Sequence, residues 1–164
     1  MSDQLVKVRF KLDAEDWHGH GGEKLWAAKL DTGLLEIKNT PFFKQGISYC
    51  DVVKASPSDD PMQFDFESVV ERGHHSTYMI LIDPTESRRG QYWKRLENAG
   101  CTCESGQIKL SIGERLIFAV DVSPTADLNE VNNVLRSGHE DGVWIYQVGY
   151  VSSHDASKAT QKLS

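Results

Sequence analysis

The stretch TYMILI at residues 77–82 decides how the second half of the chain folds. A short run of aromatic and aliphatic residues bounded by turn residues is a strong indication of a strand. The next segment, DPTES at 83–87, interrupts the strand and supplies hydroxyl groups that can cap a helix. We expect this helix at residues 90–99, because apolar residues recur there on one stripe and Gly100 stands where a left-handed helix end is needed.

The rest of the second half continues this alternation of strands and helices. Residues 102–110 form a weaker extended segment, and LIFAVDV at 116–122 is another strong strand. Asp127 is expected to cap a second helix with apolar residues at helical spacing, and Glu130 completes a capping box. Residues 143–150 form the last strand. The order strand, helix, strand, strand, helix, strand is that of the split βαβ arrangement of ferredoxin-like folds.

The first half shows the period-two alternation of strands with one buried face. Val6, Val8 and Phe10 alternate with basic residues, which predicts a first strand. Four more short strands are expected, without helices between them, at 25–30, 34–37, 47–55 and 64–69. Five such strands indicate a small barrel or a strongly curled sheet. Across both halves the expected core residues are Trp26, Phe43, Val52, Ile80, Leu96, Phe118, Val131 and Ile145.

The predicted fold class is therefore α+β, with a five-strand barrel-like sheet followed by a ferredoxin-like half. We place the barrel-like subdomain at residues 1–72, the ferredoxin-like subdomain at 73–151 and a polar tail at 152–164. No linker rich in Pro, Gly or Ser separates the two halves. Since 164 residues is also the size of one ordinary domain, the halves are expected to pack together as one unit.

The charge balance bears on the class of partner. The chain has 24 acidic and 18 basic residues, a formal net charge of -6. Phosphate backbones repel such a surface on average, which argues against nucleic acid and favours a basic protein. A local basic patch around Arg88, Arg89, Lys94 and Arg95 is the exception that the sequence offers. Aromatic residues of the first half, Trp26 among them, could stack on bases, but aromatic residues are more often found in the core.

The ends and the cysteines bear on location. No apolar run is long enough for a membrane helix, and the first residues lack the layout of a signal peptide. The three cysteines are an odd number, which does not suit a secreted disulfide framework. We therefore expect a cytoplasmic protein with no membrane partner.

The pair His18 and His20 is the most tempting metal-binding motif, with Asp13 and Asp16 close in sequence. Two histidines one residue apart can share a metal ion when the backbone is extended. A structural zinc site needs four ligands, however, and cysteines at the standard spacings are missing. We expect a solvated polar loop here, and neither a metal ion nor another cofactor.

The cysteines offer two further chemical hypotheses. Cys101 and Cys103 do not form a Cys-x-x-Cys motif, and a buried thiol beside an exposed one is a commoner outcome than a redox pair or a metal site. Cys50 could act as a nucleophile if His74 or His75 met it as a base. Because position 50 lies in an expected apolar strand, we interpret its thiol as buried and inert.

Several short motifs are shared with a known family. They are Trp26, NTPFF at 39–43, GISYCDVV at 46–53 and GHHST at 73–77. Through them the chain resembles the bacterial domain-of-unknown-function family 4265, from about Val6 to Tyr150. The family pattern has glycine where this chain has Cys50, which argues against a shared catalytic cysteine. The resemblance implies the fold and a bacterial, intracellular setting, and it brings no established activity.

Two residue groups within these motifs can be interpreted physically. Phe42 and Phe43 follow Pro41, which fixes a turn, and we expect them to plug the end of the barrel. Asp51 is expected to accept hydrogen bonds from backbone amides of the adjacent loop.

The favoured function is a protein-binding module, for example an immunity protein that neutralises a basic toxin domain such as a nuclease. Acidic patches steer such partners together and raise specificity. The candidate contact residues, all in expected loops, are Asp13, Glu15, Asp16, Asp59, Asp60, Glu140 and Asp141.

Two alternatives stay open. A small-ligand-binding protein or hydrolase-like enzyme would place a site between the halves, with His74 and His75 as its main residues and Asp51 as the orienting carboxylate. An RNA-binding module is the weaker alternative, because the acidic balance counts against it.

Overall fold

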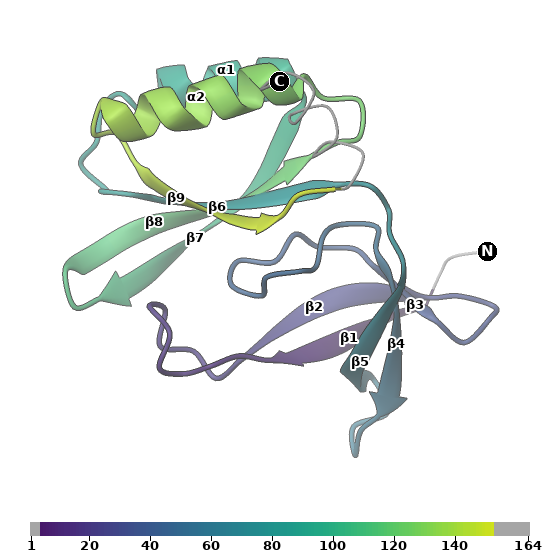
Figure 1. The fold of residues 1–164 in the computed structure, drawn as a ribbon. Helices are drawn as coiled ribbons and strands as arrows, with labels where there is room; N and C mark the ends of the chain where they lie inside the picture. Colours follow the sequence, from purple (N-terminus) through teal and green to yellow (C-terminus); the bar gives the residue numbers. More distant parts are fainter. Residues whose placement is uncertain (1–3, 153–164) are drawn as a thin grey trace.

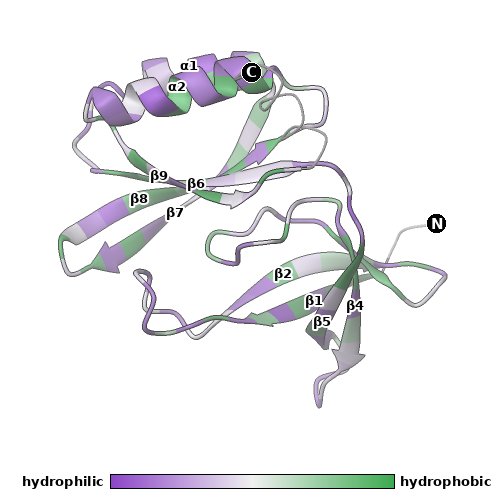
Figure 2. Cartoon of the chain, in the orientation of Figure 1, coloured by the Kyte–Doolittle hydropathy of each residue, from purple (hydrophilic) through white to green (hydrophobic). Residues whose placement is uncertain are grey.

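The first half of the chain forms a closed barrel. The computed structural model describes residues 4–152. The barrel consists of β1 (Leu5–Lys11), β2 (Gly22–Lys29), β3 (Leu35–Ile37), β4 (Val52–Pro57) and β5 (Gln63–Glu71). Consecutive strands pair antiparallel, and a parallel pairing of β1 with β5 closes the barrel. Hydrophobic and hydrophilic residues alternate along β1 (Figure 2), and the inward side chains of β1 and β2 fill the interior.

The second half forms a four-stranded sheet covered on one face by two helices (Figure 1). Its elements are β6 (Ser76–Ile82), α1 (Arg89–Ala99), β7 (Cys101–Leu110), β8 (Gly113–Val122), α2 (Leu128–Glu140) and β9 (Ile145–Tyr150). The strand order is β7-β8-β6-β9 with antiparallel neighbours, which is the ferredoxin-like arrangement. The α+β class with both sheets is therefore confirmed.

Local sequence explains where the helices begin and end. α1 stops at Gly100, whose φ of 110° only glycine adopts easily. Asp127 caps α2 by accepting a hydrogen bond from the amide of Glu130. The reciprocal half of the expected capping box is not formed, because the Glu130 carboxylate accepts from Arg95 of α1 instead. Neither of these helices is long and apolar enough to cross a membrane.

The segment 38–51, which connects β3 to β4, lies between the barrel and the uncovered face of the second sheet (Figure 1). Glu104 of β7 accepts hydrogen bonds from the side chain of Asn39 and the amide of Thr40, at 3.1 and 2.7 Å. Gly46 donates its amide to the carbonyl of Gly149 in β9 at 2.9 Å. These bonds join the barrel to the sheet through one connection.

A small apolar cluster strengthens the same contact between the halves. It contains Leu81, Ile108 and Ile117 from the sheet, with Trp17, Phe42, Phe43 and Leu110 packed against them. Phe42 and Phe43 thus cover the second sheet and are not part of the barrel core, contrary to expectation. The reason is that Glu23, at the start of β2, accepts the backbone amides of residues 42–44 and holds this turn outside the barrel.

Further expectations about the core and the strands are wrong, and the expected core residue Val52 is half-buried and belongs to none of the core clusters. Trp26 is 44% exposed because it occupies an outward position of β2, and Ile145 is 52% exposed because it begins the edge strand β9 on the uncovered face. Residues 47–51 form turns where a strand was expected, because Gly46 and Cys50 both have positive φ, at 85° and 71°. Ser152, assigned to the tail, is buried, and residues 153–164 lie outside the described part of the chain.

Packing of α2 against Trp144 gives a first prediction, for Gly138→Ala. A Cβ atom at position 138 would lie 2.5 Å from the Trp144 Nε1, which donates to the carbonyl of Leu135. We expect a net loss of about 1–3 kcal/mol, because overpacking outweighs the better helix propensity of alanine. Gly90→Ala in α1 is the matched control, since its Cβ would meet nothing within 4 Å, and it should be neutral or stabilising. Urea unfolding of both variants measures the difference, and equal effects would contradict the packing.

Candidate functional site

An apolar cleft of about 370 Å³ lies on the face of the second sheet that the helices leave uncovered. Four separate segments supply its walls: the central strand β6, the edge strand β9, the turn between β7 and β8, and the loop between β1 and β2. The lining residues are Trp17, Met79, Leu81, Leu110, Ser111, Ile112, Ile145, Tyr146 and Gln147. Most of them are apolar, which is typical of a surface that binds a partner or a ligand.

Several lining residues are unusually exposed for their type. Ile112 is 63% exposed at the tip of the β7–β8 hairpin, and Ile145 is half exposed on the edge strand β9. Edge strands with exposed apolar side chains favour association with another molecule. Exposed residues from distant parts of the chain therefore gather at one cleft and make it the strongest candidate for a functional site.

Trp17 forms the barrel-side wall of the cleft. Its ring packs against Phe43 at 5.9 Å and His18 at 5.3 Å between centroids. The buried Nε1–H of Trp17 donates to no atom of residues 4–152. A buried donor without an acceptor costs free energy.

The two histidines of the β1–β2 loop hold this wall in place. The amide of His20 donates to the Nδ1 of His18 at 2.9 Å, and the His20 ring stacks on Phe43 at 4.5 Å. His18 is buried, so the expectation of a fully solvated loop is wrong at this residue. Within the described residues, no group of three or more His, Cys, Asp or Glu side chains could hold a metal ion.

Acidic residues lie beside the Trp17 wall in the same loop. Asp13, Glu15 and Asp16 are exposed, and we call them the acidic rim. Asp13 accepts from the amide of Glu15 at 2.9 Å, and Asp16 accepts from the amide of Trp17 at 2.8 Å. The carboxylates that add negative charge to the rim therefore also fix the loop that carries the apolar wall.

The other predicted acidic contacts lie elsewhere. Asp59 and Asp60 occupy the β4–β5 turn, which points away from the second sheet (Figure 1). Because β1 runs parallel to β5, this turn and the acidic rim lie at opposite ends of β1. Glu140 ends α2, and Asp141 follows it, where its side chain accepts a hydrogen bond from Tyr92. The structure thus brings only the acidic rim next to the cleft.

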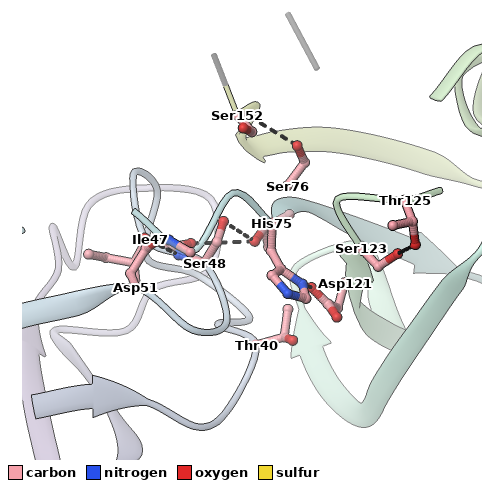
Figure 3. A network of polar contacts seen from close by, with 12 residues as sticks. Thr40, Ile47, Ser48, Asp51, His75, Ser76, Asp121, Ser123, Thr125 and Ser152 are labelled. Carbon is pink, nitrogen blue, oxygen red and sulfur yellow. Dashed lines mark hydrogen bonds and ion pairs between the residues drawn. The ribbon is translucent and has the colours of Figure 1, made fainter. Parts of the chain in front are cut away.

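Asp51 occupies the centre of the connection between the halves (Figure 3). It is fully buried, and its carboxylate accepts from the amides of Ser48 and Gly73 at 2.9 and 3.0 Å. Its third donor is the Arg72 guanidinium at 2.9 Å. The expectation that Asp51 accepts hydrogen bonds from backbone amides is confirmed. All three donors hold the chain around residues 46–51 in shape.

The alternative site is arranged differently from the prediction. His75 pairs through its Nδ1 with Asp121 at 2.7 Å, as Figure 3 shows, and Asp51 takes no part. His74 is exposed and adopts a φ of 68°. Tyr49 packs edge-on against the His75 ring at 5.2 Å. Sequence reasoning missed Asp121, although a lone acidic residue inside the apolar strand LIFAVDV was a usable indication.

Comparison with known proteins agrees with this fold. A family model described as a domain of unknown function, DUF4265, matches residues 23–146. The chain belongs to the DUF4265 family. No curated protein matches the chain. The crystal structure of a hypothetical protein from Neisseria gonorrhoeae is similar, with a TM-score of 0.68 and 14% identity over 93% of this chain and 97% of that one. At this identity the likeness extends to the fold alone.

The DUF4265 pattern with glycine before Asp51 now has a physical explanation. Cys50 occupies that position with a positive φ, a conformation that glycine adopts without strain.

Burial raises the pKa of the Cys50 thiol, and it raises the pKa of Cys101 to about 12. The three cysteines are free, and Cys103 also has a raised pKa, again chiefly from burial. The thiols are therefore protonated near neutral pH, which does not suit a nucleophile.

Proposed function

We propose that this DUF4265 protein is a protein-binding module that receives an apolar segment of a basic protein in its cleft. The observation that carries the proposal is the exposed apolar lining, exemplified by Ile112 and Ile145, next to the acidic rim. Interfaces combine an apolar centre, which provides most of the affinity, with a charged rim, which guides association.

An immunity protein that neutralises a basic toxin domain in the cytoplasm is the form of this function that we favour. The net charge of -6 and the position of the rim support it, because a basic nuclease surface would be attracted to the cleft before contact.

A small apolar ligand is the second candidate for the same cleft. The volume of about 370 Å³ lies within the range of ordinary ligand sites. A small uncharged ligand does not need the acidic rim, so the salt dependence of association separates the two candidates, because only a charged partner loses its attraction to the rim as salt is added.

Charge reversal of the rim gives the second prediction, for Asp13→Lys with Asp16→Lys. With the product of an adjacent toxin gene as partner, we expect association to slow by about ten-fold at low salt, a larger change than that in dissociation, which the loss of the two loop hydrogen bonds also affects. Asp59→Lys with Asp60→Lys changes the net charge equally at the opposite end of β1 and should have a much smaller effect. Stopped-flow association at several salt concentrations measures both variants. An unchanged association rate in the rim variant would show that the acidic rim does not guide the partner to the interface.

A further inference from the structure

The outer surface of the barrel carries a second feature that the cleft does not involve. Along β1 the apolar side chains point inward, so the basic residues between them point outward, and β2 adds two more outward residues beside them. All five are exposed. We call them the basic face, and they are Lys7, Arg9, Lys11, Lys24 and Trp26.

The strand register concentrates positive charge on this face. Arg9 lies directly opposite Lys24, and like charges in such cross-strand pairs destabilise a sheet. Arg9 is balanced by Asp65 at 2.9 Å. No carboxylate of residues 4–152 comes within 4.0 Å of the amines of Lys7, Lys11 or Lys24 in an ion pair. Most of the charge on the basic face is therefore available to an anionic partner.

The basic cluster predicted from the sequence differs in this respect. Arg88 pairs with Glu86, Lys94 with Glu97, and Arg95 with Glu130, while Arg89 donates to the backbone carbonyls of Pro84 and Glu86. Their charges are largely neutralised within the protein. The net charge of -6 is an average over all faces, and it conceals a basic surface on the barrel.

Trp26 supplies an aromatic platform among these charges. The Nζ of Lys7 lies 4.9 Å from the centre of its ring. Its backbone is held on both sides, because its amide donates to Asn39 at 2.7 Å and its carbonyl accepts from the amide of Lys38 at 2.8 Å. A fixed, exposed aromatic ring beside cations matches the way in which single-stranded nucleic acids are bound without sequence preference.

We propose that the basic face binds single-stranded nucleic acid, with a base stacked on Trp26 and phosphates paired with Lys7, Lys11 and Lys24. Alternate residues of β1 are about 7 Å apart, similar to successive phosphates of an extended strand. Aromatic stacking favours a nucleic acid over an acidic protein as the occupant, because bases have flat faces and carboxylates do not. The acidic rim, which follows Lys11 in the chain, limits the face at that end. This activity goes beyond the protein binding proposed for the cleft.

The test uses labelled oligouridylate and oligodeoxythymidylate of about 12 nucleotides and fluorescence anisotropy. Trp26→Ala should weaken binding about ten-fold, and Trp26→Phe should retain most of it, because the smaller ring still stacks. Lys7→Glu with Lys11→Glu and Lys24→Glu should abolish binding at physiological salt. A plot of log affinity against log salt has a negative slope, and we expect the slope to be steeper by about 2 with all three lysines present than with the three replaced by Gln.

The control is the triple variant Lys94→Glu, Lys109→Glu and Arg136→Glu, which changes the net charge equally on the second half and should bind like the wild type. Circular dichroism and the melting temperature establish that every variant is folded. Absence of oligonucleotide binding, or an equal loss in the control, would overturn the proposal. The proposal would also be overturned if polyglutamate competed as strongly as unlabelled oligonucleotide and Trp26→Ala had no effect. The basic face would then bind acidic proteins.

Discussion

Ile112→Asp is expected to abolish binding of the protein partner while leaving the fold intact. Ile112 is 63% exposed at the tip of the β7–β8 hairpin, so a carboxylate there stays hydrated in the free protein. In the complex the same carboxylate would be buried in an apolar cleft without a counter-charge. We expect affinity to fall by at least about 100-fold, or about 3 kcal/mol, mainly through faster dissociation.

The control for this prediction is Val70→Asp. Val70 lies on β5 of the barrel and is 53% exposed, so the substitution is chemically similar and lies outside the cleft. Titration calorimetry with the partner compares the two variants, and the melting temperatures of both should match that of the wild type. Equal affinities of the two variants would place the binding surface somewhere other than the cleft.

Asp51→Asn is expected to cause the largest loss of stability among single polar substitutions. Three donors now meet the Asp51 carboxylate: the amides of Ser48 and Gly73 and the guanidinium of Arg72. An asparagine has the same size, but its NH2 group would face at least one of these donors. Because Asp51 is fully buried, the unsatisfied groups cannot turn to water. We expect a cost of about 3 kcal/mol, which corresponds to a decrease in melting temperature of about 6–12 °C.

Asp65→Asn is the matched control for this substitution. Asp65 is also paired with an arginine, at 2.9 Å from Arg9, but the pair is well exposed, and exposed pairs contribute less than about 1 kcal/mol. Chemical and thermal unfolding of both variants measures the difference. A cost for Asp51→Asn no larger than that of the control would show that the buried carboxylate does not hold the chain around residues 46–51 in shape.

The sequence predicted the second half of the fold well because its indications are local. Residues 77–82 and 116–122 form adjacent strands, and Gly100 and Asp127 end and begin the helices as expected. Helix caps and long apolar strands depend on neighbours in the chain, so they can be recognised without knowing the fold.

The errors arise where tertiary structure overrides the local pattern. Residues 47–51 alternate like a strand, but the positive φ of Cys50 turns the chain. Trp26 is of a residue type expected in the core, and only the register of β2 against β1 shows that its side chain points outward. Neither fact can be derived from residue type alone.

The candidate site was predictable only in part. The acidic rim was recognised as an exposed loop, but the cleft next to it needs Trp17, Ile112 and Ile145, which are far apart in the sequence. The pairing of His75 with Asp121 depends on the register of β6 with β8, which places the neighbouring Thr77 opposite Asp121. Long-range registers of this kind leave no trace in a single sequence.

The most direct test of the central claim, that the cleft binds a protein, is site-specific photo-crosslinking in the native host. p-Benzoylphenylalanine replaces Ile112 in the cleft or, as a control, Val70 on β5. We predict one discrete protein adduct from position 112, none from position 70, and loss of the adduct when Asp13→Lys and Asp16→Lys are added. No adduct from position 112, or the same adduct from both positions, would contradict the account.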